Sequence, residues 1–213
     1  ATTDGDVSFA AAVAVSVHLG TVEASVANAT VTADDGVGTP DDVKLKASAT
    51  KTITTKADGS QTTEDATGVG IGVAIGIVDS DTLATLGGTT TSLTATDVTL
   101  SALMPESKFT VEAKSGASST GTAIAGSLAM NFVFIDTGAK VLAGTDVNLN
   151  GANLVLDSQA TTLGDAKGVA AAGLGSKSGD TGVGISVALS VHETNTIAVI
   201  EDDASLTSAK NVT

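Results

Sequence analysis

The stretch Gly68–Leu86 constrains the fold of this chain more than any other, because its side chains alternate strictly in size. Every second residue from Val69 to Ile77 is branched and apolar, and only glycine or alanine stands between these residues. A period of two is typical of a β-strand, whose successive side chains point to opposite faces. A helix would lose about 0.5–1 kcal/mol at each glycine. The stretch therefore predicts an extended strand with one bulky face and one bare face.

The same alternation occurs four times along the chain. After each copy the pattern predicts a turn and then a separate short strand of the form Ala-x-aliphatic. These short segments are Ala24–Val26, Ala84–Leu86, Ala139–Val141 and Ala198–Ile200. Their alanines lie 60, 55 and 59 residues apart. Internal repetition on this scale is typical of solenoids, propellers and repeat arrays.

A second box with the pattern Asp-Val-x-Leu follows the alternating stretch. We align its copies at Asp42–Ala47, Asp97–Ala102 and Asp146–Gly151, with a fourth, partial copy at Ala209–Thr213. The connectors between the two boxes differ in length, as surface loops on a fixed frame do. The chain thus divides into repeat units 1–67, 68–122 and 123–181 and a partial unit 182–213. Solenoids need caps for solubility, and since none is evident here we expect a segment of a longer protein.

These repeats predict an all-β fold, because equivalent strands of tandem units pair parallel and in register when the units stack by translation. We expect a β-solenoid, in particular a right-handed parallel β-helix, built from repeats of somewhat under 60 residues. Each repeat should supply two to three coils of about 20–30 residues. Aromatic residues make up only 2% of the chain, so aliphatic columns should fill the interior.

The bare face of the alternating strands leaves two alternatives open. Its glycine, alanine and serine residues allow another layer to approach closely. We favour a second sheet of the same coil as that layer. The alternative is a neighbouring molecule, which would make the Gly/Ala face a lateral assembly surface.

Composition argues against several classes of partner. The net charge is −14 and all ten basic residues are lysines, whereas nucleic-acid binding needs a basic face. No run of about 18 apolar residues is present, so we expect no membrane insertion. Cysteine is absent, which excludes both disulfides and thiol chemistry.

Two histidines are the first candidates for chemistry. His18 and His192 occupy the same position of the first and fourth copies, where the other copies have Val78 and Val133. With several coils between them, they should not share a metal or catalytic site. We therefore interpret them as structural residues at strand ends.

Acidic residues cluster in segments that we predict to be turns. The clusters are Asp34 and Asp35, Asp41 and Asp42, Asp79 and Asp81, and Glu201, Asp202 and Asp203. Carboxylate oxygens suit Ca²⁺, but neither a calcium-binding nonapeptide repeat nor EF-hand spacing is present. We expect solvated turns and no cofactor, with Ca²⁺ as the alternative.

One further aspartate recurs before the second box, at Asp42, Asp97 and Asp146. A recurring aspartate at a strand entry is typical of a turn residue whose side chain bonds its own backbone. β-Helices also host polysaccharide-cleaving enzymes, whose sites group carboxylates with Arg, Lys, His or Tyr. The chain has neither Arg nor Tyr. We therefore assign no catalytic, cofactor-binding or metal-binding residue and expect no enzyme; a carbohydrate-active or carbohydrate-binding β-helix is the alternative.

The run GVGIGVAIGIVDSDTLATL at 68–86, followed by TDVTLSA at 96–102, resembles the repeats of giant secreted bacterial exoproteins of the filamentous-haemagglutinin-like and leukotoxin-like kind. The resemblance covers essentially the whole chain. It implies a β-helical surface stalk, extracellular or at the cell surface, that acts in adhesion, aggregation or matrix structure. The implied partners are neighbouring copies of the same rod and host or cell-surface glycans. A self-assembling fibre subunit that packs through its Gly/Ala face is a further alternative.

Overall fold

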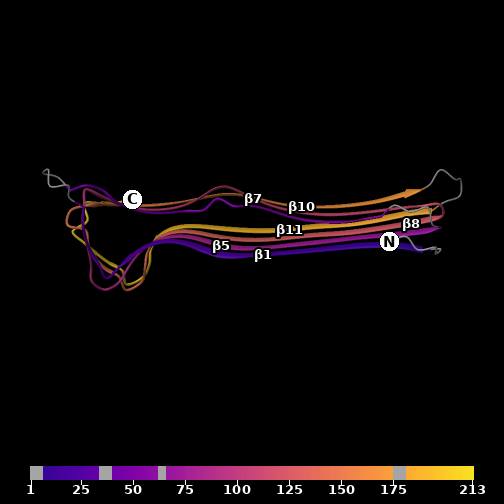
Figure 1. The fold of residues 1–213 in the computed structure, drawn as a ribbon. Coiled ribbons are helices and arrows are strands. Elements are labelled where there is room, and N and C mark those ends of the chain that lie inside the picture. Colours follow the sequence, from indigo (N-terminus) through magenta and orange to yellow (C-terminus); the bar gives the residue numbers. More distant parts are fainter. Residues whose placement is uncertain (1–6, 34–39, 62–65, 175–180) are drawn as a thin grey trace.

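The structure, a computed structural model, describes residues 7–33, 40–61, 66–174 and 181–213 and shows a parallel β-solenoid (Figure 1). The all-β class and the solenoid architecture predicted from the repeats are confirmed. Each coil passes through three parallel sheets, which we call sheets A, B and C in chain order. The hand of the coil stays a prediction.

Sheet A contains four long strands, and the other two sheets contain strands of mixed length. The strands of sheet A are β1 (Val7–Ala27), β5 (Thr67–Gly87), β8 (Thr122–Val141) and β11 (Thr181–Ile200). Those of sheet B are β2 (Thr30–Thr32), β6 (Thr91–Thr94), β9 (Asp146–Asn148) and β12 (Ser205–Thr207). Those of sheet C are β3 (Val43–Ser48), β4 (Thr52–Ser60), β7 (Asp97–Ser119), β10 (Asn153–Leu174) and β13 (Asn211–Val212).

Equivalent strands of sheet A pair parallel and without a register slip. One column across the four coils is formed by Val13, Val73, Leu128 and Val187. The alanines that we identified as the repeat markers form another such column. The repeats therefore stack by translation, as predicted.

Each sequence repeat makes one coil, so the prediction of two to three coils per repeat is wrong. Val7 pairs with Thr67, and Thr67 pairs with Thr122, which makes the coils 60 and 55 residues long. A strand of 21 residues is about 70 Å long, whereas four strands about 4.8 Å apart span only about 19 Å. The long direction in Figure 1 therefore runs along the strands, and the solenoid axis runs across them.

The turn expected before each Ala-x-aliphatic segment is not formed. β5 continues without interruption from Thr67 to Gly87. Its polar residues keep the alternation, since Ser80 and Thr82 are buried whereas Asp79 faces outward. Parallel pairing with β1 on one side and β8 on the other binds the backbone groups of β5. This pairing outweighs the local turn preference of Asp and Ser.

The third copy of the second box lies in a different sheet from the first two. Val43 pairs with Val98 in sheet C, as aligned, but the partner of Val98 in the next coil is Leu154. The segment Asp146–Asn148 is β9 of sheet B, where it pairs with β6. Our alignment was wrong here because a short pattern of alternating polar and aliphatic residues fits the start of a sheet B strand as well as the start of a sheet C strand. The true register is set by the pairing of the long strands.

The interior becomes narrower along the strands, and we divide the molecule accordingly. At one end, three sheets enclose a wide core, and we call this end the prism. Its largest buried residues are Leu45, Leu86, Leu93, Val98, Leu100, Val141, Val147, Leu149 and Leu154. In the rest of the molecule, which we call the blade, sheet A packs directly on sheet C. Its core passes from Val78, Met104, Phe109, Val133 and Ile135 to alanines that include Ala74, Ala113, Ala117, Ala123, Ala125 and Ala129.

Glycine makes the blade thin. A Cβ atom on Gly72 would lie 2.2 Å from the carbonyl oxygen of Lys114, and one on Gly70 would lie 2.1 Å from that of Gly116. The bare face of the strands is therefore internal, as we favoured, and it is not available as a lateral assembly surface. The bulky residues of the same strands lie on the outside of the blade. The expectation that they fill the interior is wrong for this part of the molecule.

Candidate interaction surface

The outer side of sheet A in the blade is an uninterrupted apolar surface. On each of its four strands, five consecutive outward positions carry an apolar side chain or glycine, and the register aligns them in five columns. We call these twenty positions the aliphatic face. They are Phe9, Ala11, Val13, Val15, Val17, Val69, Ile71, Val73, Ile75, Ile77, Ile124, Gly126, Leu128, Met130, Phe132, Val183, Ile185, Val187, Leu189 and Val191.

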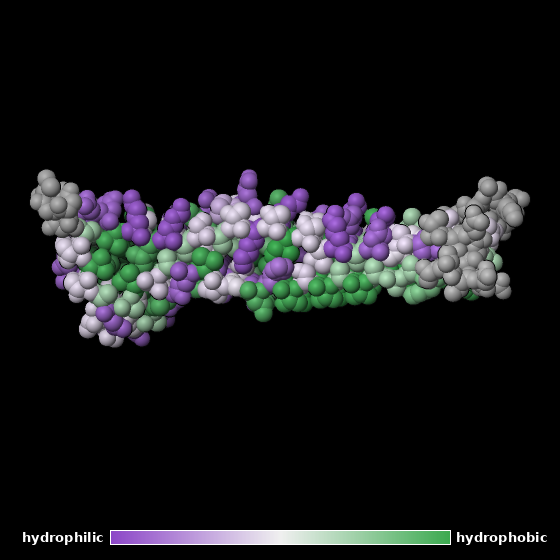
Figure 2. All heavy atoms as spheres, viewed as in Figure 1, coloured by the Kyte–Doolittle hydropathy of each residue, from purple (hydrophilic) through white to green (hydrophobic). Residues whose placement is uncertain are grey.

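The aliphatic face is solvent-exposed. On the outermost strands Val13 is 71% exposed and Ile185 is 65% exposed, and even Ile71 on an inner strand is 38% exposed. Figure 2 shows hydrophobic residues as a band along the lower edge of the blade. Nine residues of strand and four strands make an outline of about 30 by 19 Å, or about 570 Å². Apolar patches on soluble monomers seldom exceed a few hundred Å², so this face is a candidate contact surface.

Charged residues farther along the same strands explain why the bulky face points outward. Because side chains alternate along a continuous strand, the branched residues at every second position from Val69 to Ile77 lie on the same side of β5 as Asp79 and Asp81. Packing the bulky face inside would bury these carboxylates, which costs several kcal/mol for each unpaired charge. The sequence contains this signal, but it is visible only once β5 is recognised as one strand. With a turn before residue 84, the direction of the side chains before the turn would not have fixed the direction of those after it.

Polar residues border the aliphatic face at both ends. At one end lies a column that contains Thr67, Thr122 and Thr181. At the other end, two adjacent columns contain Asp79 and Glu193, then Asp81 and Asp136. Among the outward residues of sheet A that the structure describes, the carboxylates therefore lie toward the prism. The aliphatic face between the two borders is uncharged.

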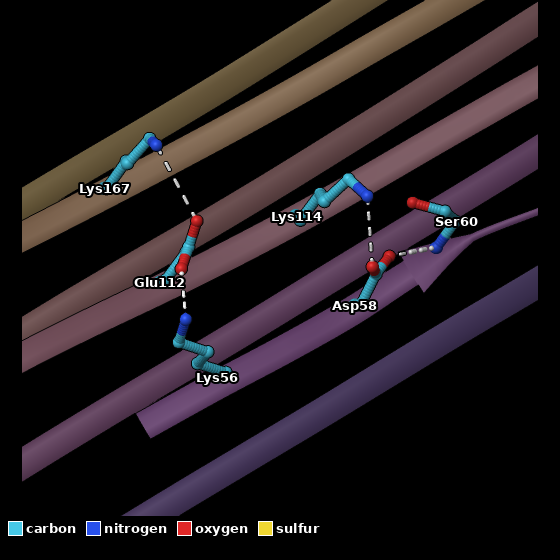
Figure 3. Close-up of polar contacts among 6 residues, drawn as sticks. All are labelled: Lys56, Asp58, Ser60, Glu112, Lys114 and Lys167. Atoms are coloured by element: carbon cyan, nitrogen blue, oxygen red, sulfur yellow. Dashed lines mark hydrogen bonds and ion pairs between the residues drawn. The ribbon is translucent and has the colours of Figure 1, made fainter. Parts of the chain in front are cut away.

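The outer side of sheet C is polar, in contrast to that of sheet A. Lys56, Glu112 and Lys167 lie side by side on three strands in one column (Figure 3). The Nζ atoms of Lys56 and Lys167 lie 3.1 and 3.7 Å from the carboxylate oxygens of Glu112. The hydrogen bond and the charge of Lys56, with a smaller effect of Lys167, lower the pKa of Glu112.

A second charged column lies two residues along the same strands. Lys114 Nζ lies 3.2 Å from Asp58 Oδ2, and the backbone N–H of Ser60 donates to Asp58 Oδ1 over 3.0 Å (Figure 3). Hydrogen bonds from Ser60, then Lys114, lower the pKa of Asp58. These pairs are exposed, so they stabilise the sheet only weakly. They nevertheless keep the outer side of sheet C hydrated.

The two histidines lie in one column but are not brought together. His18 and His192 point inward from the first and fourth strands of sheet A, with Val78 and Val133 between them. Three strand spacings separate them by about 14 Å. His192 Nε2 lies 2.7 Å from Thr162 Oγ1. Both histidines lie within long strands and not at strand ends, which corrects the position that we expected.

The acidic clusters are spread over separate sides of the coil. Asp42 pairs with Lys44 at 3.3 Å. After β11, Glu201 Oε2 accepts a hydrogen bond from the backbone N–H of Ala143 over 3.0 Å. The cluster Asp34–Asp35 lies outside the described residues. Within the described ranges, no group of three or more His, Cys, Asp or Glu side chains is placed to hold a metal ion.

One of the recurring aspartates, Asp97, has a different role from the one we expected. Asp97 does not lie in a turn but accepts a hydrogen bond from Asn153 Nδ2 in the next coil. Asn153 Oδ1 accepts in turn from Asn211 Nδ2 over 2.7 Å. A polar ladder therefore crosses three coils at the entry to sheet C. Asp146 belongs to β9 in sheet B and is not part of this ladder.

The chain matches no protein-family model, no curated protein and no solved structure. Among the residues that the structure describes, none belongs to a helix of the length and apolarity that a membrane crossing requires.

Proposed function

We propose that this chain is a non-enzymatic structural segment of a large extracellular or cell-surface protein and acts in adhesion, aggregation or matrix assembly. The observation that carries the proposal is the aliphatic face. Every coil contributes one row of five apolar positions to it, so the solenoid works as a frame that aligns equivalent rows into one continuous surface. The resemblance to giant bacterial exoprotein repeats supports the same function.

The division of polarity between the two long sheets also supports the proposal. A charged, hydrated side on sheet C keeps the molecule in solution, with the net charge of −14 adding to this effect. The opposite side presents about 570 Å² of apolar outline without a charge. Surfaces of this kind are typical of contact sites between macromolecules.

Attachment measurements test the proposed function. Microspheres coated with the chain should aggregate and should bind polystyrene, because both contacts remove the aliphatic face from water. The test variant replaces Val13 and Val187 by Lys, two of the exposed residues of its central column. We call this variant the Lys pair. It should lose most of the attachment.

A matched variant controls for the added charge. Val155→Lys with Val169→Lys makes the same two substitutions on the outer side of sheet C, because the partners of these residues are Thr99 and Lys114. We call this variant the control pair, and it should attach like the wild type. Equal attachment by all three proteins would contradict an adhesive role for the aliphatic face.

A further inference from the structure

We infer that the aliphatic face is covered by the same face of a second copy of this chain, with the strands of the two copies antiparallel. The inference rests on the proposed function, which makes this face a contact surface, and it adds the identity of the partner. A two-fold axis along the solenoid direction relates the copies. Such an isologous contact is the commonest arrangement of soluble homodimers.

The area of the aliphatic face fits a homodimer. Two outlines of about 570 Å² bury about 1,100 Å² in total, which reaches the roughly 1,000 Å² that a specific interface needs. Its four strands pair in strict register, so equivalent side chains line up in columns across the face. Two such faces pack about 10 Å apart with interdigitating side chains, as the sheets of a sandwich do. Depletion of charge at the centre is also typical of homodimer interfaces.

The polar borders select the antiparallel orientation. With a two-fold axis through the column of Val13 and Val187, this column lies over itself. Asp79 of one copy then lies over Thr67 of the other, since both are six residues from Val73. A parallel arrangement would place the acidic columns over each other, and close like charges oppose association. The antiparallel contact avoids this repulsion.

A lipid surface is the other occupant that an apolar face could take. The net charge of −14 and the carboxylates beside the face oppose binding to anionic membranes. A zwitterionic bilayer lacks this repulsion. Phosphatidylcholine vesicles therefore serve as the discriminating probe in the test below.

Analytical ultracentrifugation of the whole chain over a concentration series tests the dimer. The wild type and the control pair should show the same monomer–dimer equilibrium. The Lys pair should raise the dimer Kd by at least about 100-fold, because each introduced Lys lies opposite the identical Lys of the second molecule across the two-fold axis. Circular dichroism of each variant shows whether the fold is retained.

A charge-reversed partner makes the test specific. In Val13→Glu with Val187→Glu, the same two positions carry carboxylates, and this variant alone should also be monomeric. An equimolar mixture with the Lys pair should form a heterodimer, since Lys then faces Glu. A mixture that stays monomeric would contradict the arrangement in which the column of Val13 and Val187 lies opposite the same column of the second copy.

A spin label on the otherwise wild-type chain measures the orientation and does not depend on the charged variants. The chain has no cysteine, so Leu19→Cys provides one labelling site, six residues from Val13 and outside the aliphatic face. The antiparallel dimer predicts a label separation of about 40 Å, whereas the parallel arrangement predicts about 17 Å. The shorter distance would overturn the orientation.

The outcomes separate this inference from the proposed function. Suppose that microspheres attach, but that the wild-type chain in solution stays monomeric at about 100 times the protein concentration used in the attachment assay. The dimer is then wrong and the adhesive function stands. If the monomer floats with phosphatidylcholine vesicles and the Lys pair does not, the occupant is a lipid surface and the inference is overturned. A dimer that the Lys pair disrupts and the control pair preserves supports it.

Discussion

The prism and the blade share the long strands of sheets A and C, yet they distribute their side chains in different ways. In the prism, leucine and valine fill the interior, as in most β-proteins. In the blade, large residues such as Val78 and Phe109 fill the core only near the prism. Farther out glycine and alanine lie inside, whereas the branched residues of the aliphatic face lie outside. The difference follows from continuity. A strand that places Leu86 in the prism core must place Gly72 and Ala74 inside as well, because its side chains alternate without a break.

The comparison shows that the thickness of a solenoid can be set locally by side-chain size. Where sheet B separates the other two sheets, large residues are needed to fill the space. Where sheets A and C approach most closely, around Gly70 and Gly72, only small residues fit between the two backbones. The branched residues of the aliphatic face are thus left on the outer surface, and the core beneath them buries less apolar surface.

The largest effect should come from enlarging a glycine inside the blade. Gly72→Val places its side chain against the backbone of Lys114. We expect a loss of more than about 5 kcal/mol, enough to prevent folding of the blade. Thermal unfolding, monitored by circular dichroism, measures this loss of stability. Gly126→Val is the matched control, because nothing lies within 4 Å of its Cβ position. Equal losses in the two variants would show that the blade is not closely packed.

Truncation of large residues should separate inside from outside. Leu100 is fully buried in the prism, so Leu100→Ala should cost about 2–5 kcal/mol. Val13 is exposed on the blade, so Val13→Ala should change the free energy of unfolding by no more than about 0.5 kcal/mol. Urea unfolding at low protein concentration, where the chain is monomeric, gives both values. A large loss at Val13 would place the branched residues of the blade in a monomer core.

A buried amide joins the two sheets of the blade and should have an intermediate effect. Asn131 Nδ2 donates to the carbonyl oxygens of Phe109 and Asp165, each over 3.1 Å. Asn131→Ala should destabilise the chain by about 1–3 kcal/mol, since it leaves polar groups unpaired inside. The control is Asn195→Ala on the exposed side of β11. Urea unfolding that shows the same small change for both variants would exclude a role of this amide in holding the sheets together.

The smallest effect should come from the charged column on sheet C. Because the pKa of Glu112 is lowered in the folded chain, its ionised form stabilises the fold above the ordinary glutamate pKa of about 4.3. This contribution is lost as the pH falls through the lowered pKa. Glu112→Gln should therefore lower the unfolding midpoint slightly at pH 7 and not at about pH 2. A midpoint that is equally affected at both pH values would show that the charge is not involved.

The sequence predicted the parts of the fold that depend on repetition. The spacing of Ala24, Ala84, Ala139 and Ala198 was sufficient to predict parallel stacking in register. The side of the strand that is buried could not be inferred in the same way. Asp79 and Asp81 have strong turn preferences, and a turn at this point hides the alternation that links them to Val69–Ile77. Only the pairing of β5 on both sides shows that the strand continues.

The candidate surface was missed for the same reason. Its residues were all visible in the alternating stretches, but a branched residue in a strand fits a core as well as a surface. Local patterns also misplaced Asp146, because two different strands of one coil begin with similar sequences. In both cases long-range pairing, which a local pattern does not contain, decided the outcome.

The direction of the strands has a consequence for how such a protein could grow. Each coil uses 55–60 residues but adds only about 4.8 Å along the solenoid axis. A stack of about 1,000 residues would therefore reach only about 80 Å, close to the length of a single strand, and would form a broad plate and not a thread. Every added coil would widen the apolar surface by about 140 Å². Repeat number would then set the strength of attachment far more than it sets reach.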